Sequence, residues 1–200
     1  MVIMPISALI LCGGRAKRMH GVNKGLVKLN EQTFIQHVIS RLAPQVDEII
    51  INANREMSMY ESLGYDVYQD VSPDFIGPLA GIQLGLSHAK YDYLLTAPCD
   101  SPLLPLDLGQ RLMAKLFENH ADIAVATSRG DAHPVFCLCK KSVLPSLTEY
   151  ITNGGRKVSA WQKSLQYIEV DFSDNAEAFL NLNTPEELAS LELKLSSYVK

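Results

Sequence analysis

A glycine pair followed by several cations is the first group of residues in the sequence that could bind a phosphate. The stretch LILCGGRAKRMHGVNKG, residues 9–25, runs from apolar residues into Gly13 and Gly14 and then carries Arg18 and Lys24. Glycines let backbone N–H groups approach a phosphate, while the arginine fork and the lysine ammonium supply countercharge. The stretch has neither the Walker pattern nor the dinucleotide-binding fingerprint. Its composition alone fits a phosphate loop and a plain glycine turn with a basic rim equally well.

Two aspartates that follow apolar segments are candidates for binding a metal ion and a nucleobase. Asp100, in the segment APCDSP, offers the hard carboxylate oxygen that Mg2+ prefers, and such an ion keeps other positions for water and substrate phosphates. The alternative role of Asp100 is to cap the next helix. Asp70, at the end of YDVYQD, could accept hydrogen bonds from the donor edge of a base or could cap a turn.

A histidine and a second glycine pair form weaker candidates later in the chain. His133 precedes a proline at the start of an apolar run, where a histidine is more often structural than catalytic. The stretch GGRK at 154–157 could hold an anion at a helix N-terminus, or it could be a helix start with exposed charge. A Ser/His/Asp triad, a paired-carboxylate motif or an H-E-x-x-H pattern cannot be assigned.

The elements that must position these residues alternate between strand and helix. Apolar runs bounded by turn formers predict strands at ISALILC (6–12), VDEIIIN (46–52), YDVYQD (65–70), YDYLLTA (91–97), DIAVAT (122–127), HPVFCLC (133–139) and YIEVDF (167–172). Helical spacing, prolines and capping residues predict helices near 34–42, 56–64, 79–89, 105–120, 142–152, 156–164 and from Thr184 onward.

This alternation predicts an α/β fold with three layers, α/β/α, of the Rossmann-like type. Its sheet should be mainly parallel, with helices on both faces, and the tight SRGDA turn should make a small antiparallel excursion of the strands at 122–127 and 133–139. Neither an internal repeat nor a low-complexity linker divides the 200 residues, so we expect a single domain over 1–200.

Four of the candidates follow predicted strands. Ligands of such sheets bind outside the carboxyl ends of the strands. Gly13, Asn52, Asp70 and Asp100 stand at the ends of four predicted strands, so they should converge on one edge of the sheet if these strands are neighbours. That position favours the phosphate loop over the plain glycine turn.

Composition narrows the class of partner. The formal net charge of −4 argues against a sequence-independent nucleic-acid binder, and we expect no membrane association because apolar windows of the roughly 18 residues that span a bilayer are lacking. The first residues carry no basic n-region of a signal peptide. The 4 cysteines lack C-x-x-C spacing, which predicts free thiols in a reducing cytoplasm.

The order and spacing of the motifs resemble those of nucleotidyltransferases with the nucleotide-diphospho-sugar transferase fold, and specifically the molybdenum cofactor guanylyltransferase family. The first loop is similar to the signature L-A-G-G-x-x-x-R-M-G-x-x-K. The resemblance covers nearly the whole chain through NANR (52–55), GPLAG (77–81), PCDSP (98–102), HPV (133–135), GGRKV (154–158), VDFSD (170–174) and NLNTPEEL (181–188).

The resemblance implies a Mg2+-dependent enzyme that transfers GMP from GTP to molybdopterin, or to its molybdenum-bearing form, and releases pyrophosphate. The implied catalytic residues are Asp100, Lys24 and Arg18, with Asp100 as the metal ligand. The implied nucleotide-binding residues are Leu11, Cys12, Gly13, Gly14, Lys24, Asn52, Asp70 and Asp100. Candidates for the acceptor site are Gly81, His133, Arg156, Asn181 and Asn183. Other molybdenum cofactor biosynthesis proteins and molybdoenzyme chaperones are partners that the family suggests.

Two alternatives and three departures accompany this interpretation. A related enzyme could use CTP on molybdopterin or a nucleotide on a sugar phosphate, although LCGG and PLAG resemble the guanylyltransferase strings rather than T-A-A-G and S-L-A-T. The other alternative is a catalytically silent nucleotide-binding protein of cofactor assembly. In the first loop Cys12 replaces an alanine, His20 a glycine, and Asn23 stands where an aspartate commonly precedes the lysine.

Overall fold

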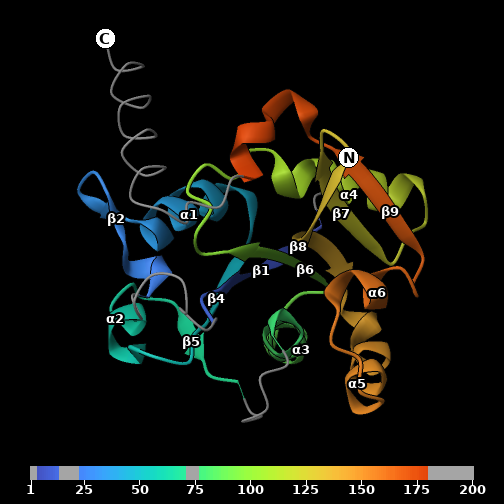
Figure 1. The fold of residues 1–200 in the computed structure, drawn as a ribbon, viewed down its shortest axis with the longest axis horizontal. Coiled ribbons are helices and arrows are strands. Elements are labelled where there is room, and N and C mark those ends of the chain that lie inside the picture. The colour runs from blue at the N-terminus through green and yellow to red at the C-terminus, as the bar shows by residue number, and fades with distance from the viewer. Residues whose placement is uncertain (1–3, 14–22, 71–76, 180–200) are drawn as a thin grey trace.

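The computed structural model describes residues 4–13, 23–70 and 77–179. Its centre is a 7-stranded sheet with the strand order β5-β4-β1-β6-β8-β7-β9 (Figure 1). The strands are β1 Ile6–Leu11, β4 Glu48–Asn52, β5 Asp66–Tyr68, β6 Tyr93–Pro98, β7 Ile123–Ser128, β8 Asp131–Lys140 and β9 Tyr167–Asp171. Each lies close to a predicted strand, so the sequence located the sheet correctly.

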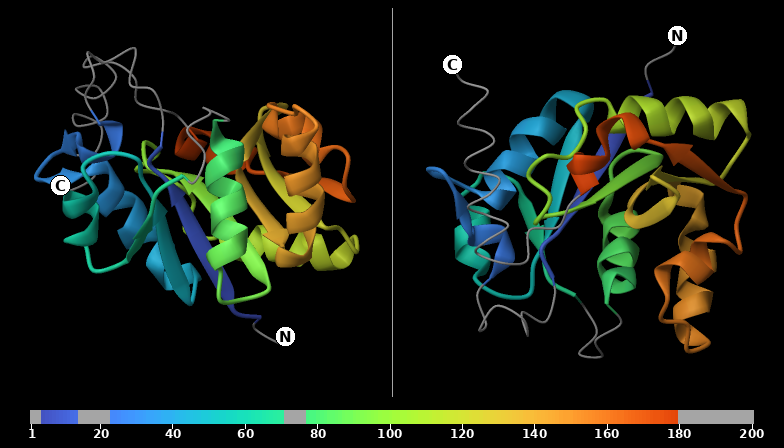
Figure 2. Two further views of the ribbon diagram at one scale, coloured as in Figure 1. Left: turned by 90° about the horizontal axis from the view of Figure 1, so that it is seen from below. Right: turned by 45° about the horizontal axis from the view of Figure 1, so that its top comes forward.

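Helices cover both faces of this sheet. They are α1 Phe34–Leu42, α2 Met57–Glu61, α3 Pro78–His88, α4 Leu108–Glu118, α5 Leu144–Thr152 and α6 Val158–Gln162. Short 3-10 turns are η1 Lys24–Leu26, η2 Ala43–Gln45, η3 Lys141–Val143 and η4 Ser173–Phe179. Helices α1 and α4 lie on one face and α3, α5 and α6 on the other, and Figure 2 shows α3 and α5 side by side. The predicted three-layer α/β/α architecture is confirmed.

The first half of the sheet is parallel throughout. Strand β1 lies between β4 and β6 and runs parallel to both, and β4 pairs in parallel with β5. All six residues of β1 are buried, as expected for a strand covered by helices on both faces. Its side chains alternate between the two cores, with Ile10 facing α1 and α4, and Leu9 facing α3.

The antiparallel part differs in position from the predicted excursion. Strands β7 and β8 do form a hairpin, but β8 is inserted in the main sheet, antiparallel to both β6 and β7. The reason is visible in its apolar half: Leu138 belongs to one core, whereas Cys137 and Cys139 belong to the other, so both faces of this strand need cover. A second antiparallel pair, β2 Lys28–Leu29 with β3 Gln32–Thr33, forms a small separate sheet that we did not predict.

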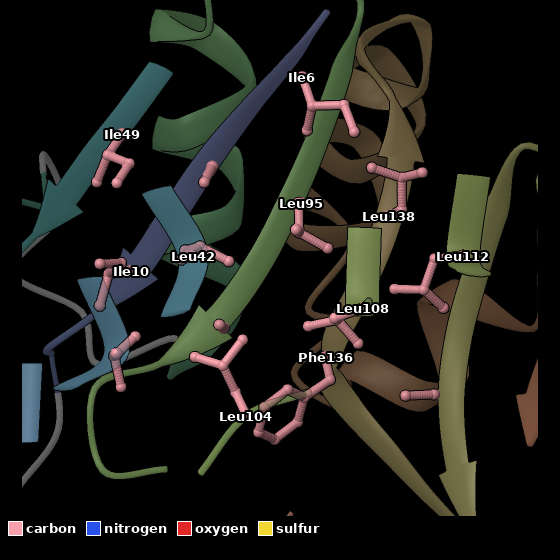
Figure 3. Packing of buried hydrophobic residues seen from close by; sticks show 14 of the residues in the cluster. Ile6, Ile10, Leu42, Ile49, Leu95, Leu104, Leu108, Leu112, Phe136 and Leu138 are labelled. Carbon is pink, nitrogen blue, oxygen red and sulfur yellow. The ribbon is translucent and has the colours of Figure 1, made fainter. Parts of the chain in front are cut away.

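Packing between the sheet and α1 and α4 forms the larger part of the core. Figure 3 shows Leu42 of α1, Leu95 of β6 and Leu108 of α4 pointing toward one another, and all three side chains are fully buried. The apolar positions of α4 recur on one side of the helix because one face of an amphipathic helix must pack on the sheet. This layer supports the carboxyl ends of β1 and β6, where the candidate site lies.

Some predicted boundaries were wrong. Helix α4 does not include Pro105 in its first turn but begins at Leu108, after Asp107 at the N-cap position. The carbonyl oxygen of Pro105 accepts hydrogen bonds from Nε2 of Gln45 at 2.9 Å and from the N–H of Leu108 at 3.4 Å, so Pro105 lies in the turn that leads into α4. The closing helix predicted from Thr184 lies outside the described residues.

The cysteines are free, as predicted, and Cys99, Cys137 and Cys139 are buried while Cys12 is partly exposed. Burial raises the pKa of the Cys137 thiol to about 11, so it stays protonated and behaves as a small apolar side chain. Within the described parts of the chain, every helix falls short of the length and apolar character that crossing a membrane requires.

Candidate functional site

The carboxyl ends of four strands meet at one edge of the sheet. Leu11, the last residue of β1, is in register with Asn52 of β4 and Pro98 of β6, and Asn52 is in register with Tyr68 of β5. The ladder continues past the strands, because the N–H of Cys12 donates to the carbonyl of Asn52 at 2.8 Å. The segments that carry Gly13, Asn52, Asp70 and Asp100 are therefore neighbours, as the sequence predicted.

Asp70 is held by two asparagines of the β4 end. Nδ2 of Asn52 donates to Oδ1 of Asp70 at 2.9 Å, and Nδ2 of Asn54 donates to Oδ2 at 2.7 Å. The backbone N–H of Asp70 donates in return to Oδ1 of Asn54 at 2.9 Å. A carboxylate has about four lone-pair sites, so these amides fix its orientation and leave acceptor capacity for a ligand. The sequence alone did not indicate this role of Asn54, although the residue lies in the NANR motif.

Two glycines allow close packing around this network. A Cβ added to Gly13 would lie 3.2 Å from Nδ2 of Asn54 and 3.3 Å from Oδ1 of Asn52, so the backbone at Gly13 passes directly over the asparagines. A Cβ added to Gly81 of α3 would lie 2.5 Å from Oδ1 of Asn52 and would collide with the side chain of Leu11. Gly81 therefore brings the start of α3 against the nucleotide-side residues, although we had considered it for the acceptor.

Lys24 and Asp100 form an ion pair across the site. Nζ of Lys24 lies 3.1 Å from Oδ2 of Asp100, and the two side chains are 28% and 13% exposed. Lys24 opens η1, while Asp100 follows β6. The alternative role of Asp100 as a helix cap is wrong, because α4 begins after Asp107. A cation and a carboxylate held together at this edge suit a phosphate chain with a divalent cation.

The carboxylate oxygens of Asp100 are ligands of the chemical type that Mg2+ prefers. Groups of three or more His, Cys, Asp and Glu side chains that could hold a metal ion are absent from the described residues. A magnesium ion needs few protein ligands, because it usually keeps several waters and is held by one or two carboxylates together with substrate phosphates. Asp100 supplies such a carboxylate beside a lysine that can contact the same phosphates.

Asn23 joins the first loop to α2. The hydroxyl of Tyr60 donates to Oδ1 of Asn23 at 2.7 Å, and Nδ2 of Asn23 donates to Glu56 at 2.8 Å. Tyr60 is fully buried, and burial raises the pKa of its hydroxyl far above the ordinary value of 10.0, so the group remains a donor. Neither partner of Asn23 was predictable from the sequence, because a five-residue helix gives too short a pattern to show which side chain faces inward.

Cys12 lies close to Cys99 and Tyr60. Burial is the main reason why the pKa of the Cys12 thiol is well above 9.0, and the neighbouring Cys99 raises it further. The thiol is therefore neutral, and the backbone N–H of Cys12 is already engaged with Asn52. The carbonyl of Cys12 is therefore the backbone group of this residue that a ligand could contact.

His133 lies at the hairpin of β7 and β8. Its Nε2 is hydrogen-bonded to Oγ of Ser128 at 2.6 Å, and its ring stacks on Phe179 with the centroids 4.5 Å apart. Burial lowers the pKa of His133, with partial opposition from the charge of Asp131. These contacts give His133 a structural role, and its contact with an acceptor stays a prediction.

Arg156 caps a helix end. Its Nη1 donates to the carbonyls of Ile151 at 3.1 Å and Gly155 at 2.7 Å, so the guanidinium binds the last turn of α5. This helix lies beside α3, where Nε2 of Gln83 donates to Thr148 at 3.0 Å. The stretch GGRK leads into a helix, because α6 begins at Val158 after Lys157 at its N-cap, and Arg156 and Lys157 are exposed. The interpretation as a helix start with exposed charge is therefore confirmed, and the anion site stays a prediction. Gly14, Arg18, Asn181 and Asn183 lie outside the described residues.

Comparison with known families identifies the family of this chain. Residues 8–167 match the model described as the MobA-like NTP transferase domain. The chain belongs to the MobA-like NTP transferase family. It is an enzyme of the nucleotidyltransferase class, as predicted, so the alternative of a catalytically silent assembly protein has no support.

Curated relatives and solved structures agree with this family. The molybdenum cofactor guanylyltransferase of Polynucleobacter asymbioticus is 48% identical over 95% of this chain and 97% of its own length. That of Shewanella piezotolerans is 45% identical over 93% of this chain and 91% of its own length. The fold matches molybdopterin-guanine dinucleotide biosynthesis protein A from Archaeoglobus fulgidus with a TM-score of 0.78 at 21% identity, covering 96% of this chain and 99% of that one.

Proposed function

We propose that this member of the family transfers GMP from GTP to molybdopterin, or to molybdenum-bearing molybdopterin, with Mg2+ as the cofactor and pyrophosphate as the second product. The observation that carries the proposal is the convergence of two units at one sheet edge. One unit is Asp70 with its asparagines, and the other is the Lys24–Asp100 pair. The names of the relatives supply the guanylyl group and the acceptor.

The proposed base contact uses the carboxylate of Asp70. Guanine presents two adjacent donors, N1–H and the N2 amino group, whereas cytosine presents only its N4 amino group as a donor. A carboxylate whose orientation is fixed by Asn52 and Asn54 can accept both guanine donors through its remaining lone pairs. Leu11, Cys12 and Gly13 line the same end of β1 and would contact the nucleoside.

The proposed chemistry needs positioning and charge neutralisation rather than a general base. A phosphate monoester has a second pKa of about 6 and is largely ionised at neutral pH. An oxygen of the acceptor phosphate forms a bond to the α-phosphorus of GTP, and the bond from that phosphorus to the bridging oxygen breaks as pyrophosphate leaves. Lys24, and Arg18 by the family signature, would stabilise the negative charge that develops.

The magnesium ion would be held by Asp100 and the phosphates. When bound, it neutralises the charge of the triphosphate and of the leaving pyrophosphate. Backbone N–H groups of Gly13 and Gly14 would add donors to the same phosphates. For the pterin acceptor, Gly81, His133, Arg156, Asn181 and Asn183 stay predictions.

A nucleotide panel tests the proposal. Purified protein, Mg2+ and molybdopterin are incubated separately with GTP, CTP, ATP and UTP, and pyrophosphate release is measured. GTP should give the highest kcat/KM. A preference for CTP, or activity with a sugar phosphate in place of molybdopterin, would instead assign the chain to another activity of the same fold.

A further inference from the structure

We propose that Asn23 and Glu56 form a matched pair that positions Lys24 against the phosphates of the nucleotide. This inference rests on the proposed function, because it concerns the same site. Glu56 then acts through Asn23 and contacts no substrate, which makes it a positioning residue. Three features support it: the direction of the hydrogen bond from Asn23 to Glu56, the contacts of the backbone on either side of Lys24, and the backbone conformation of Glu56.

The hydrogen-bond partners of Asn23 determine which way its side-chain amide points. An ionised carboxylate only accepts hydrogen bonds, so the nitrogen of Asn23 must face Glu56, as it does at 2.8 Å. Its oxygen then faces the hydroxyl of the buried Tyr60, which donates at 2.7 Å. Both ends of this amide are therefore satisfied by α2 and the residue before it, and the side chain has one favourable orientation.

The backbone around Lys24 is held on both sides. Asn23 is the N-cap of η1, and its carbonyl accepts from the N–H of Leu26 at 3.0 Å. On the other side, a Cβ added to Gly25 would lie 2.7 Å from the Tyr60 hydroxyl and 3.2 Å from Sγ of Cys99, so the turn rests directly on these two side chains. Lys24 lies between the two anchors and reaches Asp100 at 3.1 Å.

Glu56 has an unusual backbone for its residue type. Its φ of 52° and ψ of 36° place it in the left-handed region, which is unfavourable for a residue with a Cβ and persists where surrounding contacts require it. This conformation stands at the start of α2, so Glu56 and Tyr60 approach Asn23 from one short segment. The strained residue is thus the one whose side chain holds the loop.

The pairing has a consequence for the allowed residue types. An aspartate at position 23 would bring a carboxylate oxygen against Glu56 at hydrogen-bonding distance, where two negative charges repel each other. An aspartate at 23 requires a donor at 56, whereas an asparagine at 23 suits the glutamate. This explains why a neutral amide precedes the lysine in this chain, where the resembling family commonly has an aspartate.

A double-mutant cycle tests the pair. Asn23→Asp, Glu56→Gln and the double variant are compared with the native protein for kcat and KM with GTP and for the Kd of a GTP analogue with a non-cleavable α,β-methylene linkage. The double variant has the same net charge as the native protein and restores a hydrogen bond of reversed polarity. We expect Asn23→Asp to lower kcat/KM about tenfold, within the range of coupling between contacting residues, and the double variant to recover to within about threefold.

Controls separate the possible failures. Glu61→Gln, which removes an exposed charge from the same helix, shows the effect of charge alone, and Tyr60→Phe tests the second anchor if Asn23→Asp does not fold. A double variant as impaired as Asn23→Asp would overturn the pairing. If the native protein binds the analogue but transfers nothing to molybdopterin, the proposed function fails while the binding cycle still tests the pair.

Discussion

At the scale of single residues, Asp100 is the group on which the proposed chemistry depends most. Its carboxylate offers hard oxygen ligands at this sheet edge and lies beside the ammonium group of Lys24. It is also 13% exposed, so its interactions with a phosphate-bound ion would be less screened than on the open surface. The neighbouring Asp70 is engaged by amides instead, which assigns the two aspartates to different parts of the nucleotide.

Replacing Asp100 should abolish most turnover. We expect Asp100→Ala to lower Mg2+-dependent kcat by at least about a hundredfold, the scale for removing one preorganised electrostatic stabiliser. Steady-state pyrophosphate release at saturating GTP measures this. Asp107→Asn, which changes a more exposed aspartate after the same strand, is the matched control. Near-native kcat for Asp100→Ala would reduce Asp100 to a structural role.

His133 should make stability depend on pH. In the folded protein burial lowers its pKa below 6.5, so between pH 6.5 and that lower value the unfolded chain binds more protons. The free energy of unfolding should therefore fall as the pH drops through this window. Above pH 6.5 the contribution of the neutral His133 to stability should be complete. Urea denaturation at several pH values should show a shallower fall for His133→Gln than for the native protein and for the control His120→Asn. An equal slope for His133→Gln would contradict the assignment.

At the scale of elements, α3 is the helix that brings packing and the site together. Its first turns lie against the ends of β1 and β4, and this approach depends on Gly81, which is in contact distance of Leu11 and Asn52. Any side chain at this position must push the helix away from the strands or displace Asn52 from Asp70. Stability and nucleotide binding should therefore be coupled here.

A pair of glycine variants tests that coupling. Gly81→Ala should destabilise the protein by about 1–3 kcal/mol, the usual cost of overpacking, and should also raise the Kd for GTP. Gly109→Ala in α4 is the matched control, because its Cβ would meet Leu95 at an ordinary 3.5 Å and alanine favours helices by about 0.5–1 kcal/mol. Urea unfolding and nucleotide titration measure both effects. Equal stability of the two variants would show that α3 can shift without cost.

The elements also show what local sequence can predict. Strand β1 was predictable because an unbroken apolar run followed by glycines is a local pattern. The central place of β8 was not, since FCLC is apolar on both faces but nothing local says that β6 will be its second partner. Likewise, Asp70 and Asp100 follow strands and could be placed by a general rule, whereas Glu56 acts through a left-handed backbone that its residue type does not favour.

At the scale of the whole molecule, the nucleotide should stabilise the fold. The site is built from the ends of β1, β4, β5 and β6 and from η1, so a ligand there joins segments that are far apart in sequence. Binding to the folded state alone adds about 2.7 kcal/mol at a hundred times Kd. The stabilisation should be selective if Asp70 reads the base.

Thermal unfolding tests this selectivity. At a hundred times its Kd, GTP with Mg2+ should raise Tm by about 5–10 °C, because each kcal/mol shifts Tm by about 2–4 °C in a protein of this size. CTP at the same concentration should raise Tm less. Asp70→Asn should reduce the difference between the two nucleotides, because an amide presents one acceptor where the carboxylate presents two. Equal shifts for GTP and CTP in the native protein would contradict a guanine-selective site.

The insertion of β8 also has a consequence for synthesis of the chain. By the time residue 98 has been made, β5, β4, β1 and β6 can already assemble in parallel, but β6 then exposes an unpaired edge. Its partner arrives only when residues 131–140 have followed. An exposed strand edge can pair with other chains, so a partly synthesised chain is more prone to aggregation until β8 has paired with β6.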